Sequence, residues 1–282
     1  MPVAVVTDST ACLPPGVAAQ RGIRVVALEV RIGDRTGLEG RDISTCELTA
    51  ALADRRLDVQ TSQPAPAEFA TCYEQALQAG ADSIVSVHLS RELSGTWEAA
   101  QQAAGEVDPR RIRVVDSRAA AMGLGFTVLA AADAAGSGQS GAAVERAATA
   151  VAQRCRVFFS VDSLDRLRRG GRIGPAAALL GTALAVKPLL HVEDGRIMPL
   201  EKVRTTARAE QRLVDLAVAA GGDGPADVAV HHLGAAERAG RVAGVLAERM
   251  TTSNVVVSEL GAVLGAHVGL GALGVVVVPK NA

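Results

Sequence analysis

Hydroxyl side chains gather at one turn of this sequence, between an apolar segment and a helix-compatible one. Residues 83–88 are rich in β-branched side chains and predict a strand, whereas residues 97–104 are rich in alanine and glutamine and suit a helix. Between them stand Ser94, Gly95 and Thr96. Hydroxyls at a strand-to-helix turn, with the free N–H groups of the helix start, can hold a carboxylate, a phosphate or an oxyanion. The alternative is that Ser94 only caps the helix.

A second hydroxyl pair, Thr61-Ser62, precedes another predicted helix, which runs from Pro66 to about residue 79. The two prolines within residues 60–66 predict irregular backbone there, because proline is excluded from helix interiors and central strands. Thr61 and Ser62 are therefore expected just before a helix N-terminus, where they offer the same kind of anion-binding chemistry as the first cluster.

His267 is a third candidate, within the glycine-rich stretch 265–269, which we expect to be a loop between apolar segments. The flanking glycines allow close approach of the backbone to a ligand, and the imidazole can donate or accept a hydrogen bond. A ligand contact and a purely structural role both remain open for this residue.

Four arginines surround the pair Gly170-Gly171. They are Arg166, Arg168, Arg169 and Arg172. One interpretation is a solvated helix end, since cations are favourable at helix C-termini. The other is a docking surface or a phosphate contact, which the two-pronged geometry of the guanidinium suits. Charge alone does not decide between them.

Apolar, β-rich runs alternate with helical segments over the first half of the chain. Three such runs end in polar turns, at Thr7-Asp8-Ser9, Leu89-Ser90 and Asp116-Ser117. Alternating strands and helices predict a doubly wound, mostly parallel sheet, in which ligands bind beyond the carboxyl ends of the strands. The polar turns would lie on that side.

The second half predicts a different α/β domain. It contains a hairpin signal at Glu193-Asp194-Gly195 and an apolar, alanine-rich helix expected from Pro175 to Ala185. We place the domain boundary after Gln153, which gives an N-terminal α/β domain of residues 1–153 and a C-terminal α/β domain of residues 154–282. The fold class is thus α/β with two domains.

Composition and motifs exclude several classes of function. A net charge of -1 and only 2% aromatic residues argue against nucleic acid as a partner. The cysteines are Cys12, Cys46, Cys72 and Cys155, with no pair at C-x-x-C spacing, so neither a metal site nor a disulfide framework is predicted. The sequence also lacks a P-loop and a G-x-S-x-G elbow, and no cofactor is expected. The G-x-G-x-x-G match at residues 269–274 leads into a strand rather than out of one, which is the wrong context for a dinucleotide.

The start of the chain lacks the basic and apolar regions of a signal peptide, and no apolar run reaches about 18 residues, the length that a membrane span needs. We therefore expect a cytoplasmic protein without stable membrane insertion.

Taken in order, the motifs resemble those of the DegV family of bacterial fatty-acid-binding proteins over nearly the whole chain. They are Thr7-Asp8-Ser9-Thr10, Thr61-Ser62-Gln63-Pro64, Leu89-Ser90 with Leu93-Ser94-Gly95-Thr96, Asp116-Ser117, Arg169-Gly170-Gly171-Arg172-Ile173, Lys187-Pro188, and His267-Val268-Gly269 with Gly271-Ala272. The resemblance implies a non-catalytic lipid carrier. Its fatty acid would place the acyl chain in an apolar tunnel and the carboxylate on hydroxyls at the domain junction.

The resemblance also implies roles for individual residues. The carboxylate would meet the hydroxyls and N–H groups of Thr61, Ser62, Ser94, Gly95 and Thr96, with His267 nearby. Some relatives present their fatty acid to a separate kinase that makes an acyl phosphate. In that setting the partner or phosphate contacts would be Arg169, Arg172 and Arg204.

A rival hypothesis is a serine acyl hydrolase or transferase. Ser94 would be the nucleophile, His267 the base, and Asp8 or Asp116 the group that orients the base. This mechanism requires hydrogen-bond reach between nucleophile and base.

Overall fold

The computed structural model describes residues 2–54, 57–179, 186–252 and 254–280. The chain groups into two compact units, Met1–Glu29 with Ser62–Arg154, and Val30–Thr61 with Cys155–Ala282. The boundary between Arg154 and Cys155 lies one residue from the predicted one, but no local pattern indicated that residues 30–61 group with the C-terminal half. The division into an N-terminal domain of residues 1–153 and a C-terminal domain of residues 154–282 stays a prediction.

The first unit is built on a four-stranded sheet in the order β2-β1-β6-β7. Its strands are β1 (Val3–Asp8), β2 (Ile23–Val26), β6 (Ser83–His88) and β7 (Ile112–Asp116). Each neighbouring pair is parallel. The predicted parallel sheet is therefore confirmed, and the polar turns follow the carboxyl ends of β1, β6 and β7.

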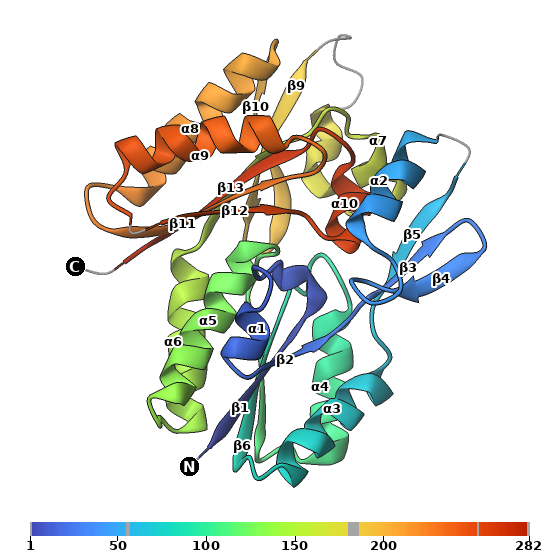
Figure 1. Ribbon diagram of the computed structural model, residues 1–282, viewed down its shortest axis with the longest axis vertical. Coiled ribbons are helices and arrows are strands. Elements are labelled where there is room, and N and C mark those ends of the chain that lie inside the picture. Colours follow the sequence, from blue (N-terminus) through green and yellow to red (C-terminus); the bar gives the residue numbers. More distant parts are fainter. Residues whose placement is uncertain (1, 55–56, 180–185, 253, 281–282) are drawn as a thin grey trace. The chain divides into compact units, whose positions relative to one another are not determined.

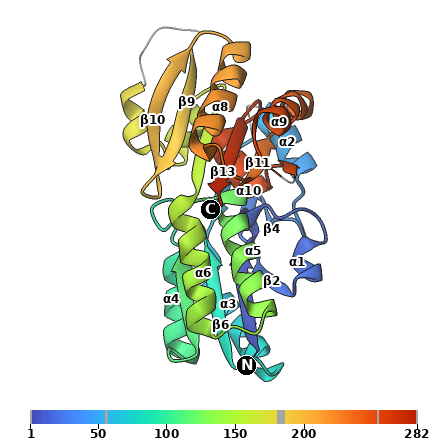
Figure 2. The same cartoon turned by 90° about the vertical axis from the view of Figure 1, so that its left-hand side faces the viewer.

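Helices cover both faces of this sheet (Figures 1 and 2). They are α3 (Pro66–Gln78) with α4 (Thr96–Val107) on one face, and α5 (Met122–Gly136) with α6 (Gly141–Arg154) on the other. The short η1 (Ser9–Ala11) and α1 (Val17–Gln20) connect β1 to β2. Because successive strand residues face opposite sides, Val6 packs with the α3/α4 core and Val5 with the α5/α6 core.

The second unit holds a six-stranded sheet in the order β10-β9-β8-β13-β11-β12. Its strands are β8 (Arg156–Ser160), β9 (Lys187–Glu193), β10 (Arg196–Val203), β11 (Ala226–His232), β12 (Val255–Glu259) and β13 (Leu273–Pro279). Only the β11–β12 pair is parallel; the other four pairs are antiparallel. The predicted hairpin is confirmed: Asp194 and Gly195 both have positive φ between β9 and β10, as a two-residue turn requires.

The helices of this unit are α7 (Asp165–Arg169), α8 (Thr206–Gly221), α9 (Ala236–Arg249) and α10 (Ala262–Val268). Leu213 of α8 and Leu246 of α9 belong to the buried core that also contains Val230 and Val275 of the sheet. The predicted helix at 175–185 is wrong in its first part, where the chain forms the 3₁₀ helix η2 (Gly174–Leu179), and residues 180–185 lie outside the described residues.

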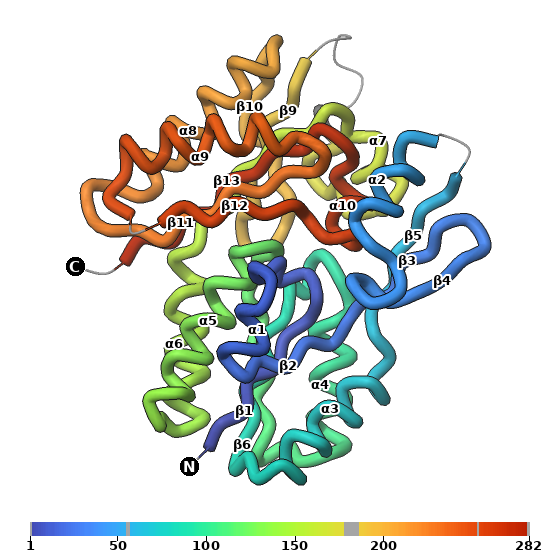
Figure 3. Tube along the Cα trace, viewed as in Figure 1, coloured from blue at the N-terminus to red at the C-terminus, as the bar shows by residue number. Residues whose placement is uncertain are grey.

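A small sheet of order β4-β3-β5 carries the Thr61 segment (Figure 3). Its strands are β3 (Glu29–Ile32), β4 (Arg35–Leu38) and β5 (Val59–Ser62), and α2 (Thr45–Ala53) lies between β4 and β5 in the chain. The expectation of irregular backbone at residues 60–62 is thus wrong. The prolines begin only at Pro64, so they end β5 rather than prevent it.

Within the described part of the chain, no helix combines the length and the apolar character needed to cross a bilayer.

A buried polar network fastens β1 to β6 in the first unit. Asp8 Oδ1 accepts hydrogen bonds from the Thr10 N–H (3.0 Å) and the Thr10 hydroxyl, and Asp8 Oδ2 accepts from the Leu89 N–H (3.1 Å) and lies 3.0 Å from His88 Nδ1. The other ring nitrogen of His88 lies 2.7 Å from Ser86 Oγ, which in turn accepts from Tyr73. These hydrogen bonds offset the cost of burying the Asp8 carboxylate.

We expect Asp8→Asn to destabilise the first unit strongly. In wild type the carboxylate accepts hydrogen bonds from surrounding N–H and O–H donors, and the asparagine amide would place its own N–H groups against some of them. Leaving fully buried donors without an acceptor costs about 3 kcal/mol or more of folding free energy. Urea unfolding at pH 7 measures the change, and the exposed Asp34→Asn is the matched control, expected to shift stability by less than ~0.5 kcal/mol. Equal stabilities for the two variants would contradict the interpretation.

Candidate functional site

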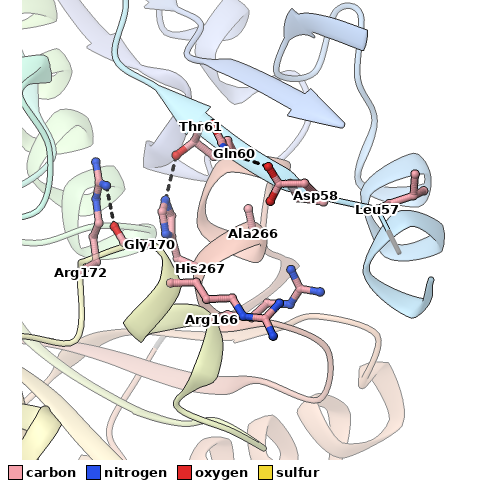
Figure 4. Close-up of a pocket in the computed structure, with 11 residues that line it drawn as sticks. Leu57, Asp58, Gln60, Thr61, Arg166, Gly170, Arg172, Ala266 and His267 are labelled. Carbon is pink, nitrogen blue, oxygen red and sulfur yellow. Dashed lines mark hydrogen bonds between the residues drawn. The ribbon is translucent and has the colours of Figure 1, made fainter. Parts of the chain in front are cut away.

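A pocket of about 230 Å³ opens in the second unit. Its described lining consists of Leu57, Asp58, Val59, Gln60, Thr61, Arg166, Arg169, Gly170, Arg172, Ala266 and His267. Figure 4 shows β5 contributing one wall, α10 a second and the end of α7 a third. The pocket thus collects side chains from three segments that are far apart in the sequence.

The centre of the pocket is a hydrogen bond between Thr61 Oγ1 and His267 Nε2, at 2.8 Å (Figure 4). His267 lies in the last turn of α10, so the expectation of a glycine-rich loop is wrong. Gly265 is tolerated inside this helix because it packs closely: a Cβ there would lie 2.6 Å from the Leu48 side chain of α2. The helix ends at Gly269, whose positive φ is a glycine conformation.

Gly170 fits closely against the same imidazole. A Cβ at this position would collide with His267 Nδ1, although the backbone angles of Gly170 suit any residue. The motif Arg169-Gly170-Gly171-Arg172 therefore includes a glycine for reasons of space, and that glycine lets the ring reach Thr61.

Burial, and then the positive charge of Arg172, lower the pKa of His267 from its ordinary value of 6.5 to about 4. The imidazole is therefore neutral at pH 7, with one ring nitrogen as a donor and the other as an acceptor. At that pKa the ring is a weak general base, which disfavours its role in the hydrolase hypothesis.

Three guanidinium groups line the pocket. Arg172 donates from Nη1 to the Gly170 carbonyl (2.6 Å), and Arg166 donates from Nη2 to the Leu52 carbonyl (3.4 Å). Partial burial, and then the charge of Arg169, lower the pKa of Arg166. Arg168 faces elsewhere: it is exposed and pairs with Asp165 on its own helix turn. The structure thus separates one arginine of the cluster from the other three.

Asp58 is the one carboxylate among the described lining residues. Its Oδ2 already accepts hydrogen bonds from Arg31 (3.1 Å) and Gln60 (2.8 Å). Three arginines against one paired carboxylate give the pocket an excess of positive charge, which favours an anionic ligand.

The structure brings together Thr61, His267, Arg169 and Arg172 of the predicted site residues. Ser62 is not in the described lining, and its hydroxyl donates to Glu29 Oε2 (2.8 Å). Arg204 is exposed at the end of β10 and is not in the lining either. Sequence reasoning gave no site role to Asp58 or Gln60, and it named Arg166 and Gly170 only as members of the arginine cluster and its glycine pair. The spacing of Arg166 and Arg169, one helical turn apart, was the available signal for Arg166 as a lining residue.

The Ser94-Gly95-Thr96 turn belongs to the first unit. Ser94 Oγ accepts from the Thr96 N–H (3.3 Å) and lies 2.8 Å from Thr96 Oγ1, at the start of α4. A Cβ on Gly95 would collide with the Gln63 side chain. Gly95 rather than Ser94 is the N-cap residue of α4, so the expectation that Ser94 caps the helix is wrong in its position, and Ser94 accepts only the N–H of the first helical residue. The binding of a ligand by Ser94, Gly95 and Thr96 stays a prediction.

The carboxylates offered as orienting groups in the hydrolase hypothesis are engaged within their own unit. Asp8 takes part in the network with His88, and Asp116 Oδ1 accepts from the Arg118 N–H (2.8 Å). Asp8, His88 and Ser86 do form an Asp–His–Ser hydrogen-bond series, but each is fully buried in the core. A substrate carbonyl has no access to that serine, so the series is structural.

Among the described residues, no cluster of three or more His, Cys, Asp or Glu side chains is arranged to hold a metal ion.

The low pKa of His267 predicts a pH-dependent stability. The unfolded chain takes up this proton near pH 6.5 and the folded protein only near pH 4, so the stabilising effect is complete at pH 7 and is lost as the pH falls through this window. Between pH 7 and pH 5 we expect wild type to lose on the order of 1 kcal/mol more than His267→Gln. Urea unfolding of both proteins at the two pH values measures this difference. Equal losses would show that His267 is not held neutral.

Comparison with known proteins gives the family. The family model described as "Uncharacterised protein, DegV family" matches residues 2–280. A DegV domain-containing protein of Streptomyces coelicolor is 52% identical over 279 residues, which cover 98% of both chains.

Solved structures agree with this match. The chain is similar to a DegV family protein from Thermus thermophilus, described by its fatty acid binding, with a TM-score of 0.94, 34% identity and coverage of 99% of this chain and 100% of the other. It is similar to DegV from Bacillus subtilis, described as a fatty acid binding protein, with a TM-score of 0.88, 34% identity and the same coverage. The family model over residues 2–280 and the 52% identical relative lead to one conclusion: this chain belongs to the DegV family.

Proposed function

We propose that this protein binds a long-chain fatty acid without catalysing a reaction on it, and that the Thr61–His267 pair receives the carboxylate. The observation that carries the proposal is this hydrogen-bonded pair, which lines a pocket with three arginines. Two solved relatives at 34% identity, both described by their binding of fatty acids, support the choice of ligand.

The chemistry of the pair suits a carboxylate. When the imidazole carries its proton on Nε2, it donates to Thr61 Oγ1, and the Thr61 hydroxyl hydrogen is then available to the ligand. The neutral ring avoids placing a second formal charge beside Arg172. An acyl chain gains about 0.8 kcal/mol for each buried CH₂ group, and a carboxylate left without donors would cancel much of that gain.

The arginines suggest a second step, in which the loaded protein presents its fatty acid to a separate kinase that forms an acyl phosphate. Arg169 and Arg172 lie in the pocket, where they suit a phosphate, and Arg204 is exposed on the same unit, where it suits a partner surface. Ser62, Ser94, Gly95 and Thr96 are proposed as further carboxylate contacts from the first unit.

Loss of the Thr61 hydroxyl should weaken fatty acid binding. Thr61→Val keeps the size of the side chain but removes a hydrogen bond to a charged group, worth about 1.5–3 kcal/mol, so we expect at least a ~10-fold weaker affinity for oleate. Equilibrium binding of radiolabelled oleate measures the effect. Thr36→Val, at an exposed position of β4, is the matched control and should bind as wild type does.

Native mass spectrometry of the purified protein tests the ligand class directly. We expect co-purified fatty acid, released and identified after denaturation. A protein that carries no lipid and takes up neither palmitate nor oleate would refute the proposed function, whereas a reproducible esterase activity lost in Ser94→Ala would favour the hydrolase hypothesis.

The presenting role makes a separate prediction for Arg204. Arg204→Ala should bind oleate within about twofold of wild type, because Arg204 is outside the pocket lining, but should support at least ~10-fold less acyl phosphate formation by the kinase. Trapping of the ATP-dependent product with hydroxylamine measures this, with the exposed Arg110→Ala as control. An unchanged rate would remove Arg204 from the partner surface.

A further inference from the structure

The short helix α10, which carries His267, lacks a capping side chain of its own. Its N-cap residue is Gly261, and no side chain of that residue exists to accept from the first N–H groups. A helix of seven residues is marginal by itself, so its position depends on what holds its ends.

The carboxylate of Glu39 supplies the missing acceptor. Glu39 directly follows β4 and lies 224 residues before Val263 in the sequence. Glu39 Oε1 accepts the Val263 N–H at 2.7 Å, and only 9% of the Glu39 residue is exposed. A Cβ on Gly261 would collide with this carboxylate, so glycine makes room for the contact. A carboxylate at a helix N-terminus also interacts favourably with the helix dipole.

The loop that holds Glu39 is itself well fixed. The Gly40 N–H donates to the Ile43 carbonyl (3.0 Å), Glu39 and Ile43 form an isolated β-bridge, and the Ile43 side chain is buried. The Glu39 carboxylate therefore presents a fixed point to the helix.

These contacts fasten α10 at two positions four residues apart, one in its first turn and one in its last. At Val263 the N–H meets Glu39, and at His267 the ring meets Thr61. Glu39 directly follows β4, and Thr61 lies on β5. Both strands belong to the small sheet, in which β3 lies between them. Any axial shift or rotation of α10 that broke the first contact would also move the imidazole.

We infer that Glu39 is a positioning residue of the proposed carboxylate site: its carboxylate caps α10 across the chain and thereby sets where His267 stands relative to Thr61. The inference rests on the proposed function for its consequence, a loss of fatty acid affinity, but its structural part is independent of any ligand.

The test measures the environment of the His267 ring and the affinity for oleate in separate experiments. The chain has five histidines, so ring resonances of protein labelled in histidine can be assigned by comparison with His267→Gln. In ligand-free protein we expect Glu39→Ala to move the His267 resonances as Gly170→Ala does, the latter variant serving as a positive control for a displaced ring. Glu39→Gln, which keeps a neutral acceptor of the same size, should preserve the wild-type spectrum. The exposed Glu248→Ala on α9 is the matched negative control.

With oleate, we expect Glu39→Ala to bind at least tenfold more weakly and Glu39→Gln to stay within threefold of wild type. If Glu39→Ala does not fold, Gly261→Ala replaces it, because the added methyl displaces the carboxylate without removing it. A folded variant with a lower Tm but unmoved His267 resonances and unchanged affinity would overturn the inference and leave Glu39 a merely stabilising residue. Wild-type protein that binds no oleate would refute the proposed function, and the His267 resonances would still decide whether Glu39 positions the ring.

Discussion

The hydrogen bond between Thr61 and His267 is the interaction on which the candidate site depends. It joins residues 206 positions apart, one on a strand of a three-stranded sheet and the other at the end of a seven-residue helix. Neither side chain is placed by its local sequence. The ring reaches the strand because Gly170 leaves it space and because α10 is capped from outside. A small number of close contacts thus sets the geometry of a site that the rest of the unit supports.

Electrostatics gives this pair its chemistry. The pocket contains more guanidinium groups than carboxylates, and burial, together with the positive charge of Arg172, lowers the pKa of His267 so that the ring is neutral at pH 7. A neutral imidazole and a hydroxyl are directional hydrogen-bond partners, whereas the arginines supply attraction that acts over a longer distance. An anionic ligand in such a pocket would meet both kinds of interaction, and these donors would offset the cost of its desolvation.

The buried network of the first unit contains polar residues of similar types, but their role is structural. Asp8, His88 and Ser86 are hydrogen-bonded in series, as they would be in a serine hydrolase, yet all three are sealed in the core and satisfied by one another and by Thr10, Leu89 and Tyr73. The network ties the carboxyl ends of β1 and β6 together. The residue types are those of catalysis, but access decides function, and here the side chains serve to hold two strands and the following turn in place.

The sequence by itself determined the α/β class, the parallel sheet of the first unit, the β9–β10 hairpin and the residue types of the site, because periodicity, turn residues and hydroxyl-glycine turns are local properties. It also indicated the family through motifs in a fixed order. Only the tertiary structure decided that Thr61 meets His267 in the pocket whereas Ser62 bonds to Glu29, since both partners lie far away in the sequence. It alone separated Arg168 from its neighbours, grouped residues 30–61 with the C-terminal half and placed His267 on a helix. These features arise from contacts between segments far apart in the chain, such as Glu39 with Val263, and no local pattern encodes them.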